Sequence, residues 1–201
     1  MLSDGFNYFL DFGNTFRCFQ SFQRILEGVP GGEKFLPDGL SMAKSLGGGF
    51  PIGAFWLREP FQDLLGAGTH GSTFGGTPLA CAVALKILEV IEKEKLADNA
   101  RQLGAWMQNE LDRLAKTYPS VVTCSRGIGF MLGLELAEKI PAFAASDKSA
   151  ASQFVNRLHA VGVLTIPAGT QIVRLLPSLN LKPQEAAEGI AKIEEVVKSI
   201  T

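Results

Sequence analysis

A single lysine precedes three consecutive glycines between two apolar segments of the chain. Two residues separate Lys44 from glycines 47–49, and the next apolar segment begins at Ile52. Consecutive glycines lose much backbone entropy on ordering, so they indicate a sharp turn or the close approach of a bulky group. A lysine here is either a solvated loop charge or a reactive amine, which burial or a nearby positive charge keeps neutral.

A second loop of small residues, 71–76, contains two neighbouring hydroxyls, Ser72 and Thr73. Thr77 and Pro78 follow as the N-cap and first residue of a predicted helix. Free backbone N–H groups, hydroxyls and a helix N-terminus together suit a phosphate dianion. An ordinary flexible loop before a capped helix is the alternative, and the Walker A spacing is absent. Beside Lys44, a phosphate loop suggests a phosphorylated aldehyde cofactor such as pyridoxal phosphate.

Arg174 lies in a predicted strand at 172–176, which Pro177 interrupts. A charge at a strand end is often half of a weak surface ion pair. The alternative is a guanidinium that binds a substrate carboxylate through two parallel hydrogen bonds. The sequence around it leaves both interpretations open.

Four stretches, 41–54, 70–81, 126–135 and 173–177, resemble in order the motifs of class III pyridoxal-phosphate aminotransferases. The resemblance covers 35–201, and the acetylornithine and ornithine aminotransferases are the most similar branch. It implies an α/β fold, that of the aspartate aminotransferase-like PLP-dependent transferases (fold type I). The chain would hold an N-terminally truncated large domain and a C-terminal α/β small domain.

The resemblance also implies roles for individual residues. Lys44 would hold pyridoxal phosphate as a Schiff base and, once freed, move a proton at the substrate Cα. Ser72 and Thr73 would bind cofactor phosphate, which in this family belongs to the partner subunit, so a homodimer is expected. Arg174 would bind the substrate α-carboxylate. Thr77 stands where relatives have asparagine, and both residue types cap helices.

The implied reaction is transamination from an ω-amino donor, N-acetylornithine or ornithine in type, to 2-oxoglutarate. A catalytically inactive fragment that keeps the small domain and a dimerisation surface is the main alternative. An aminomutase-like relative with the same fold is a third possibility. All three depend on the resemblance rather than on composition.

Elements that the family places upstream of the lysine motif are not found in this sequence. They include an aspartate that pairs with the pyridine nitrogen, and Asp11 has neither the following glutamate nor the spacing for that role. The expected domains are therefore an atypical N-terminal segment (1–36), a remnant of the cofactor-binding large domain (37–110) and the small domain (111–201). The first half is expected to expose apolar surface that missing strands would cover.

Composition excludes several classes of function. The 201 residues carry 19 basic and 20 acidic side chains, so no basic field exists for nucleic acid or an anionic membrane. No apolar run is long enough to span a membrane, and no signal peptide is recognisable. Three scattered cysteines, Cys18, Cys81 and Cys124, indicate free thiols and a cytoplasmic protein. Two histidines are too few for a metal cluster, so no metal site is expected.

Hydrophobic periodicity gives the expected elements. The helices are expected at 60–66, from Pro78, from Leu96 to about Tyr118, at 147–161 and at 183–200. The strands are expected before Ala43, at 52–57, on both sides of a turn at 126–129, at 163–166 and at 172–176. In the helix from Pro78, the buried face is expected to comprise Leu79, Val83, Ile87, Val90 and Ile91. In the helix from Leu96, the apolar stripe is expected to comprise Leu96, Ala100, Leu103, Met107, Leu111 and Leu114.

Overall fold

The computed structural model describes residues 37–69 and 71–201. It divides into two compact units, the first ending at Ala97 and the second spanning Asp98–Thr201. The domain boundary expected after residue 110 lies further along the same helix, α3 (Leu96–Thr117), and that division stays a prediction. The predicted N-terminal segment 1–36, with Asp11 and Cys18, lies outside the described residues, as does His70.

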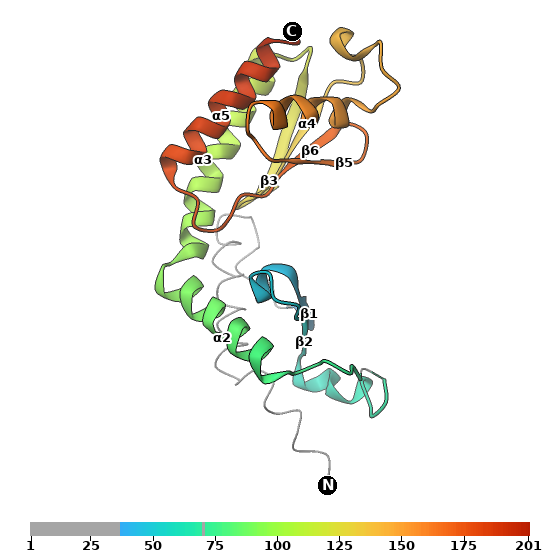
Figure 1. Ribbon diagram of the computed structural model, residues 1–201, viewed down its shortest axis with the longest axis vertical. Helices are drawn as coiled ribbons and strands as arrows, with labels where there is room; N and C mark the ends of the chain where they lie inside the picture. The colour runs from blue at the N-terminus through green and yellow to red at the C-terminus, as the bar shows by residue number, and fades with distance from the viewer. Residues whose placement is uncertain (1–36, 70) are drawn as a thin grey trace. The chain divides into compact units, whose positions relative to one another are not determined.

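Between residues 37 and 95, leaving out residue 70, the first unit contains a two-stranded sheet, two 3-10 helices and one α-helix, which Figure 1 shows. Its elements are β1 (Gly39–Met42), η2 (Lys44–Gly47), β2 (Ala54–Leu57), η3 (Glu59–Leu64) and α2 (Pro78–Lys93). β1 and β2 pair antiparallel, with Leu40 opposite Trp56. Both predicted strands are confirmed, whereas the short helix predicted at 60–66 is the 3-10 helix η3.

The buried face of α2 differs from the predicted one. Ala80, Ala84 and Leu88 are the buried residues of this helix, whereas Leu79 is 61% exposed. Large apolar residues define the periodic stripe, but alanines allow η2 to approach the helix axis more closely. Among the described residues of this unit, the buried cluster consists of Leu46, Ala84 and Leu88, with partly buried apolar residues around it.

Thr77 occupies the predicted N-cap position of α2, with Pro78 as the first helical residue. Its side chain makes no capping hydrogen bond, so the expected role of the hydroxyl is wrong. The Thr77 carbonyl instead accepts the N–H of Cys81 at 3.0 Å. Proline at N1 removes one of the N–H groups that otherwise need a partner, which lowers the demand for a side-chain cap.

The second unit is built on a four-stranded sheet in the order β3-β4-β6-β5, with antiparallel neighbours throughout. Its strands are β3 (Val122–Ile128), β4 (Met131–Leu136), β5 (Ile166–Ala168) and β6 (Ile172–Leu175). The turn predicted at 126–129 is shorter, because Arg126 pairs with Gly133 and Ile128 with Met131. β5 also begins later than predicted, at Ile166.

Gly127 explains why the hairpin between β3 and β4 is so tight. Its φ is +154°, and a Cβ there would lie 2.1 Å from the Met131 carbonyl oxygen. No residue with a side chain fits this close backbone approach without moving a strand. The glycine of the third motif is therefore structural, as the sequence indicated for this turn.

Three helices cover one face of the sheet (Figure 1). They are α3, α4 (Ala150–Ala160) and α5 (Pro183–Lys198), while a 3-10 turn, η4 (Pro141–Phe143), lies between β4 and α4. Leu132, Leu134 and Leu136 alternate along β4 and are at most 2% exposed, so they share the core with all three helices. The predicted helices are confirmed, and the predicted stripe of α3, from Ala100 to Leu114, is buried.

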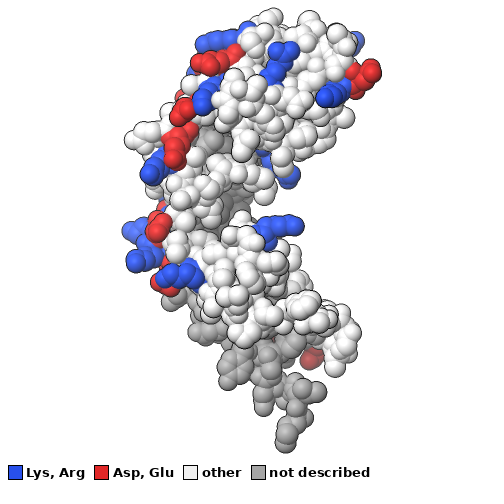
Figure 2. Space-filling model, viewed as in Figure 1, with Lys and Arg blue, Asp and Glu red and all other residues white. Residues whose placement is uncertain are grey.

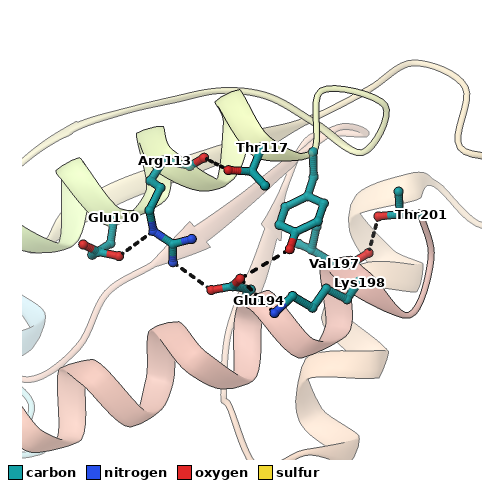
Figure 3. Close-up of polar contacts among 8 residues, drawn as sticks. Glu110, Arg113, Thr117, Glu194, Val197, Lys198 and Thr201 are labelled. Carbon is teal, nitrogen blue, oxygen red and sulfur yellow. Dashed lines mark hydrogen bonds and ion pairs between the residues drawn. The ribbon is translucent and has the colours of Figure 1, made fainter.

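An ion-pair network joins α3 and α5, which run side by side (Figure 3). Arg113 donates to Glu194 at 2.7 Å and to Glu110 at 2.9 Å. The hydrogen bond from Arg113, followed by that from Lys198, lowers the pKa of Glu194 to about 2. The same contacts, first with Glu194 and then with Glu110, raise the pKa of Arg113.

Charge is mixed on the face drawn in Figure 2, where basic and acidic side chains alternate. Among the helices of residues 37–69 and 71–201, not one combines the length and the apolar character that crossing a membrane requires. Cys81 and Cys124 are free thiols.

Candidate cofactor and substrate site

Lys44 is exposed and begins the short helix η2 directly after β1. Its φ is +56°, in the left-handed region, although the preceding Ala43 is fully extended. An L-residue pays about 1–2 kcal/mol to adopt this conformation, so surrounding contacts must impose it. Strained residues of this kind concentrate at active sites and ligand clamps, but the exposed Lys95 between α2 and α3 has a similar φ of +53°, so the backbone angle alone does not single out Lys44.

The turn that carries Lys44 is fixed by backbone hydrogen bonds and one buried side chain. The N–H of Leu46 donates to the Ala43 carbonyl at 3.1 Å, and that of Gly48 donates to the Ser45 carbonyl at 3.2 Å. Leu46 is 7% exposed and contributes to the buried cluster with α2. The strained lysine is therefore held by a hydrogen-bonded turn whose neighbouring leucine is buried.

Gly48 satisfies both conditions that the glycine triplet suggested. Its φ is +54°, and a Cβ there would lie 2.8 Å from Cδ1 of Ile87 on α2. The chain therefore turns sharply at a point where a bulky side chain also reaches the backbone. By contrast, Gly49 has a φ of +105° and no atom within 4 Å of its would-be Cβ.

Ser72 and Thr73 lie in the loop that leads into α2, and both are exposed. The N–H of Gly75 donates to the Ser72 carbonyl at 3.2 Å, so the loop contains a hydrogen-bonded turn. Phe74, between the hydroxyls and this glycine, is 81% exposed. The loop thus presents two hydroxyls and a large apolar ring on the surface of the first unit.

Arg174 lies on β6, directly opposite Gly133 of β4 and Ile166 of β5. Along β6, Arg174 alternates with the buried Val173 and Leu175, which face the helices. Arg174 and the two residues opposite it therefore lie on the other face of the sheet, which the helices leave uncovered. Among the residues that the structure describes, no ion pair includes Arg174, and its buried Nε has no hydrogen-bond partner. An unsatisfied buried donor is costly, so this guanidinium is suited to an incoming carboxylate.

Arg126 differs from Arg174 although it lies on the same sheet face. Its guanidinium pairs with Glu135 at 3.1 Å. Arg126 on β3 and Arg174 on β6 both lie opposite Gly133 of β4 in the strand register. Of these two arginines, only Arg126 makes an ion pair in the described part of the chain. The third motif, residues 126–135, thus forms a hairpin in which Arg126 makes an ion pair within the motif.

The predicted site residues are distributed over both units. Lys44, Ser72 and Thr73 belong to the first unit and Arg174 to the second. Within the described ranges, no hydrogen bond or ion pair joins any two of these four. Sequence reasoning missed Ile87 as a contact of the glycine turn, because helical spacing does not tell which residue meets a loop distant in sequence.

Comparison with known proteins places this geometry in a family. The model of the aminotransferase class-III family matches residues 33–197. Acetylornithine aminotransferase of Gloeobacter violaceus is 39% identical over 160 residues, which are 80% of this chain and 37% of that protein. Succinylornithine transaminase of Photorhabdus laumondii is 35% identical over 161 residues, covering 80% of this chain and 38% of that protein.

A solved structure of the ornithine aminotransferase from Toxoplasma gondii has a TM-score of 0.72 and 34% sequence identity. The match covers 85% of this chain and 38% of the Toxoplasma chain. PLP is described at partial occupancy in the active site of that protein. The predicted fold, that of the PLP-dependent transferases of fold type I, is confirmed. The chain spans less than two-fifths of the length of these relatives. On the extent of the family match and the identity with these relatives, the chain belongs to the class III aminotransferases.

Proposed function

We propose that this protein acts in pyridoxal-phosphate-dependent transamination from an ω-amino donor, of the N-acetylornithine or ornithine type, to 2-oxoglutarate. The observation that carries the proposal is the position of Lys44 directly before the glycine turn, in the lysine motif of the family whose model matches residues 33–197. A fixed turn of this kind would help a nucleophile that must point at one carbon atom.

The residues present fit the cofactor in three respects. Lys44 offers an exposed amine, Ser72 and Thr73 offer exposed hydroxyls near a helix N-terminus, and Arg174 offers a guanidinium with an unpartnered Nε. Pyridoxal phosphate, when bound, supplies an aldehyde for the amino group and a ring that accepts electrons from the substrate. Among the described residues we assign no carboxylate to its ring nitrogen.

Each of these side chains then has one task. The Lys44 amine would bind the cofactor covalently and, once released, would take and return a proton at the carbon that carries the transferred amino group. Ser72 and Thr73 donate hydrogen bonds to the phosphate of the cofactor in the partner subunit, which makes the active protein a homodimer. Arg174 orients the substrate through its α-carboxylate.

The proposed donors follow from the names of the relatives. Those names include acetylornithine, succinylornithine and ornithine, which share the ornithine skeleton. The relatives differ in what is attached to that skeleton. A donor series should therefore contain N-acetylornithine, ornithine and, as an ω-amine that has a carboxylate but no α-amino group, 4-aminobutyrate.

A spectroscopic titration tests the proposal. Purified protein is mixed with pyridoxal phosphate, and the absorbance of the lysine-bound cofactor is followed for the wild type and Lys44→Ala. We expect the band in the wild type alone, and we expect the preferred donor to bleach it. A wild type without the band, or a variant that retains it, would contradict the assignment of Lys44.

A catalytically inactive protein is the second candidate, and the small core of the first unit favours it. Only Leu46, Ala84 and Leu88 form the buried cluster around the lysine turn in the described residues. Such a protein would keep the second unit and a dimerisation surface without turning over. It would show neither the absorbance band nor bleaching by any donor.

A further inference from the structure

We propose that Ile87 of α2 is a positioning residue that holds the Lys44 turn in its strained conformation. It touches no reacting atom and acts through Gly48, four residues beyond the lysine. The inference rests on the proposed function for Lys44 and extends it to a residue that belongs to none of the four motifs.

The contact is specific to one methyl group. Cδ1 of Ile87 lies 2.8 Å from the position a Gly48 Cβ would take, whereas its Cγ1 lies 3.7 Å away. Because Gly48 has no side chain, Cδ1 of Ile87 can occupy the space where a Cβ of residue 48 would lie. Ile87 is half-buried, and a change of volume at such a contact is felt by its neighbours to the extent that they do not relax into the space.

Ile87 and Leu46 hold the turn from two positions. Leu46 is buried against Ala84 and Leu88. Ile87 contacts the C-terminal end of the turn at Gly48, whose N–H closes the hydrogen bond to Ser45 at 3.2 Å. Both contacts lie on the C-terminal side of Lys44, and together they fix residues 46–48, the end of the turn that Lys44 begins.

The same helix also starts at the hydroxyl loop. α2 begins at Pro78, directly after the loop with Ser72 and Thr73, and Ile87 lies in its third turn. Because a helix is stiff over this length, α2 fixes the lysine turn relative to its own N-terminus. Ile87 would thus set the position of the amine within a frame that also includes the proposed phosphate loop.

The experiment compares three single variants that differ by single methyl groups or their position. Ile87→Val removes Cδ1, and Ile87→Leu keeps a δ-methyl group as the conservative replacement. Ile91→Val removes the same group one turn further along α2, where Ile91 is packed against the Leu46 cluster. It is a matched control because Ile91 is not among the atoms next to Gly48.

The first readout is the rate at which Lys44 is labelled by pyridoxal phosphate under borohydride reduction. The amine adds to the aldehyde carbon, water leaves, and hydride from the reagent reduces the C=N bond to a stable secondary amine. Peptide mass spectrometry gives the label at Lys44, and Lys93 at the end of α2 is the internal reference. A general loss of structure would change both lysines.

We expect Ile87→Val to slow labelling at Lys44 about tenfold relative to Lys93, because a misplaced nucleophile loses much of its rate. Ile91→Val should stay within about twofold of the wild type, and Ile87→Leu should recover most of the rate. Equal effects of Ile87→Val and Ile91→Val, or equal slowing of both lysines, would overturn the positioning role. A wild type that labels Lys44 no faster than Lys93 would overturn the proposed function.

A second readout needs no cofactor. Amide hydrogen exchange of the peptide that covers 44–50 reports the hydrogen bonds of the turn. Ile87→Val should speed this exchange several-fold while peptides of the second unit remain unchanged. If exchange in the turn is the same in Ile87→Val and the wild type, Ile87 does not hold it, whatever the labelling shows.

Discussion

The two units of this protein bury apolar surface in very different ways. In the second unit, side chains from three helices and the sheet meet in one continuous core that includes Leu111, Phe154 and Val197, each at 0% exposure. Among residues 37–69 and 71–97 of the first unit, the buried cluster next to the strained turn of Lys44 comprises three residues. Within the described part of the chain, the second unit therefore has an extensive core of its own, whereas the turn of Lys44 keeps a costly conformation on little buried area.

The largest expected effect comes from the core of the second unit. Phe154→Ala should lower the free energy of unfolding by about 3–5 kcal/mol, because a fully buried ring leaves a cavity. Trp106 lies on α3 of the second unit and Trp56 on β2 of the first, so urea unfolding can be followed in each. Single-tryptophan variants, Trp56→Phe and Trp106→Phe, separate the two signals.

The Trp106 transition should shift to lower urea while the Trp56 transition stays in place. Leu46→Ala should do the opposite, because its neighbours all belong to the first unit. If either substitution moves both transitions together, the two units unfold as one and the comparison between them is wrong.

A smaller effect is expected where the first unit carries its strain. Gly48→Ala places a Cβ against Cδ1 of Ile87 and forces an L-residue to a φ of +54°. We expect a loss of about 2–3 kcal/mol from the Trp56 transition, since overpacking and a left-handed residue both cost energy. The control is Gly48→Ala in an Ile87→Val background, which keeps the φ of +54° but lacks Cδ1, each loss being taken relative to its own parent protein. Equal losses for the two variants would show that Ile87 packing contributes nothing.

The ion-pair network between α3 and α5 predicts a pH dependence confined to the second unit. The pKa of Glu194 is about 2, below its usual 4.5, so its stabilisation is complete above pH 4.5 and lost as the pH falls through 2. Because Arg113 is 44% exposed, the gain should be only about 1 kcal/mol.

Glu194→Gln should therefore flatten the acid limb of the Trp106 transition and leave the Trp56 transition unchanged. The measurement is urea unfolding between pH 2 and pH 6, at low salt because screening weakens exposed pairs. An unchanged acid limb in the variant would assign the pH dependence to other carboxylates.

The smallest expected effect is a gain in stability. Gly189 lies inside α5, and no atom is within 4 Å of the position its Cβ would take. Gly189→Ala should therefore raise the free energy of unfolding of the second unit by about 0.5–1 kcal/mol, since alanine restricts the unfolded chain and favours helix. A loss of stability would indicate that this space is used by a contact in solution.

Sequence was sufficient to predict the elements whose structure depends on the burial of large apolar side chains at regular spacing. The stripe from Ala100 to Leu114 was predicted because α3 buries leucines at helical spacing against a sheet. The prediction for α2 was wrong because that helix buries alanines, which carry little weight in a hydrophobic pattern. The turn predicted at 126–129 was too long, because residues 126–128 continue β3 through backbone pairing with β4. Side-chain type does not show this pairing.

For the candidate site, the chemical groups could be proposed from sequence, but the backbone conformation and packing that hold them could not. Lys44, Ser72, Thr73 and Arg174 came from motifs, and their roles stay predictions. Neither the left-handed conformation of Lys44 nor the contact between Gly48 and Ile87 could be predicted. Both depend on packing between segments distant in the chain, which no local pattern encodes.

The backbone at position 44 has a consequence for the evolution of this turn. A φ of +56° suits glycine or asparagine better than lysine, so stability alone would favour replacing the residue. A protein that needed only to fold would gain by losing this lysine. On the role proposed for Lys44, its presence at a site that disfavours it would be a trade of stability for activity, made at one residue.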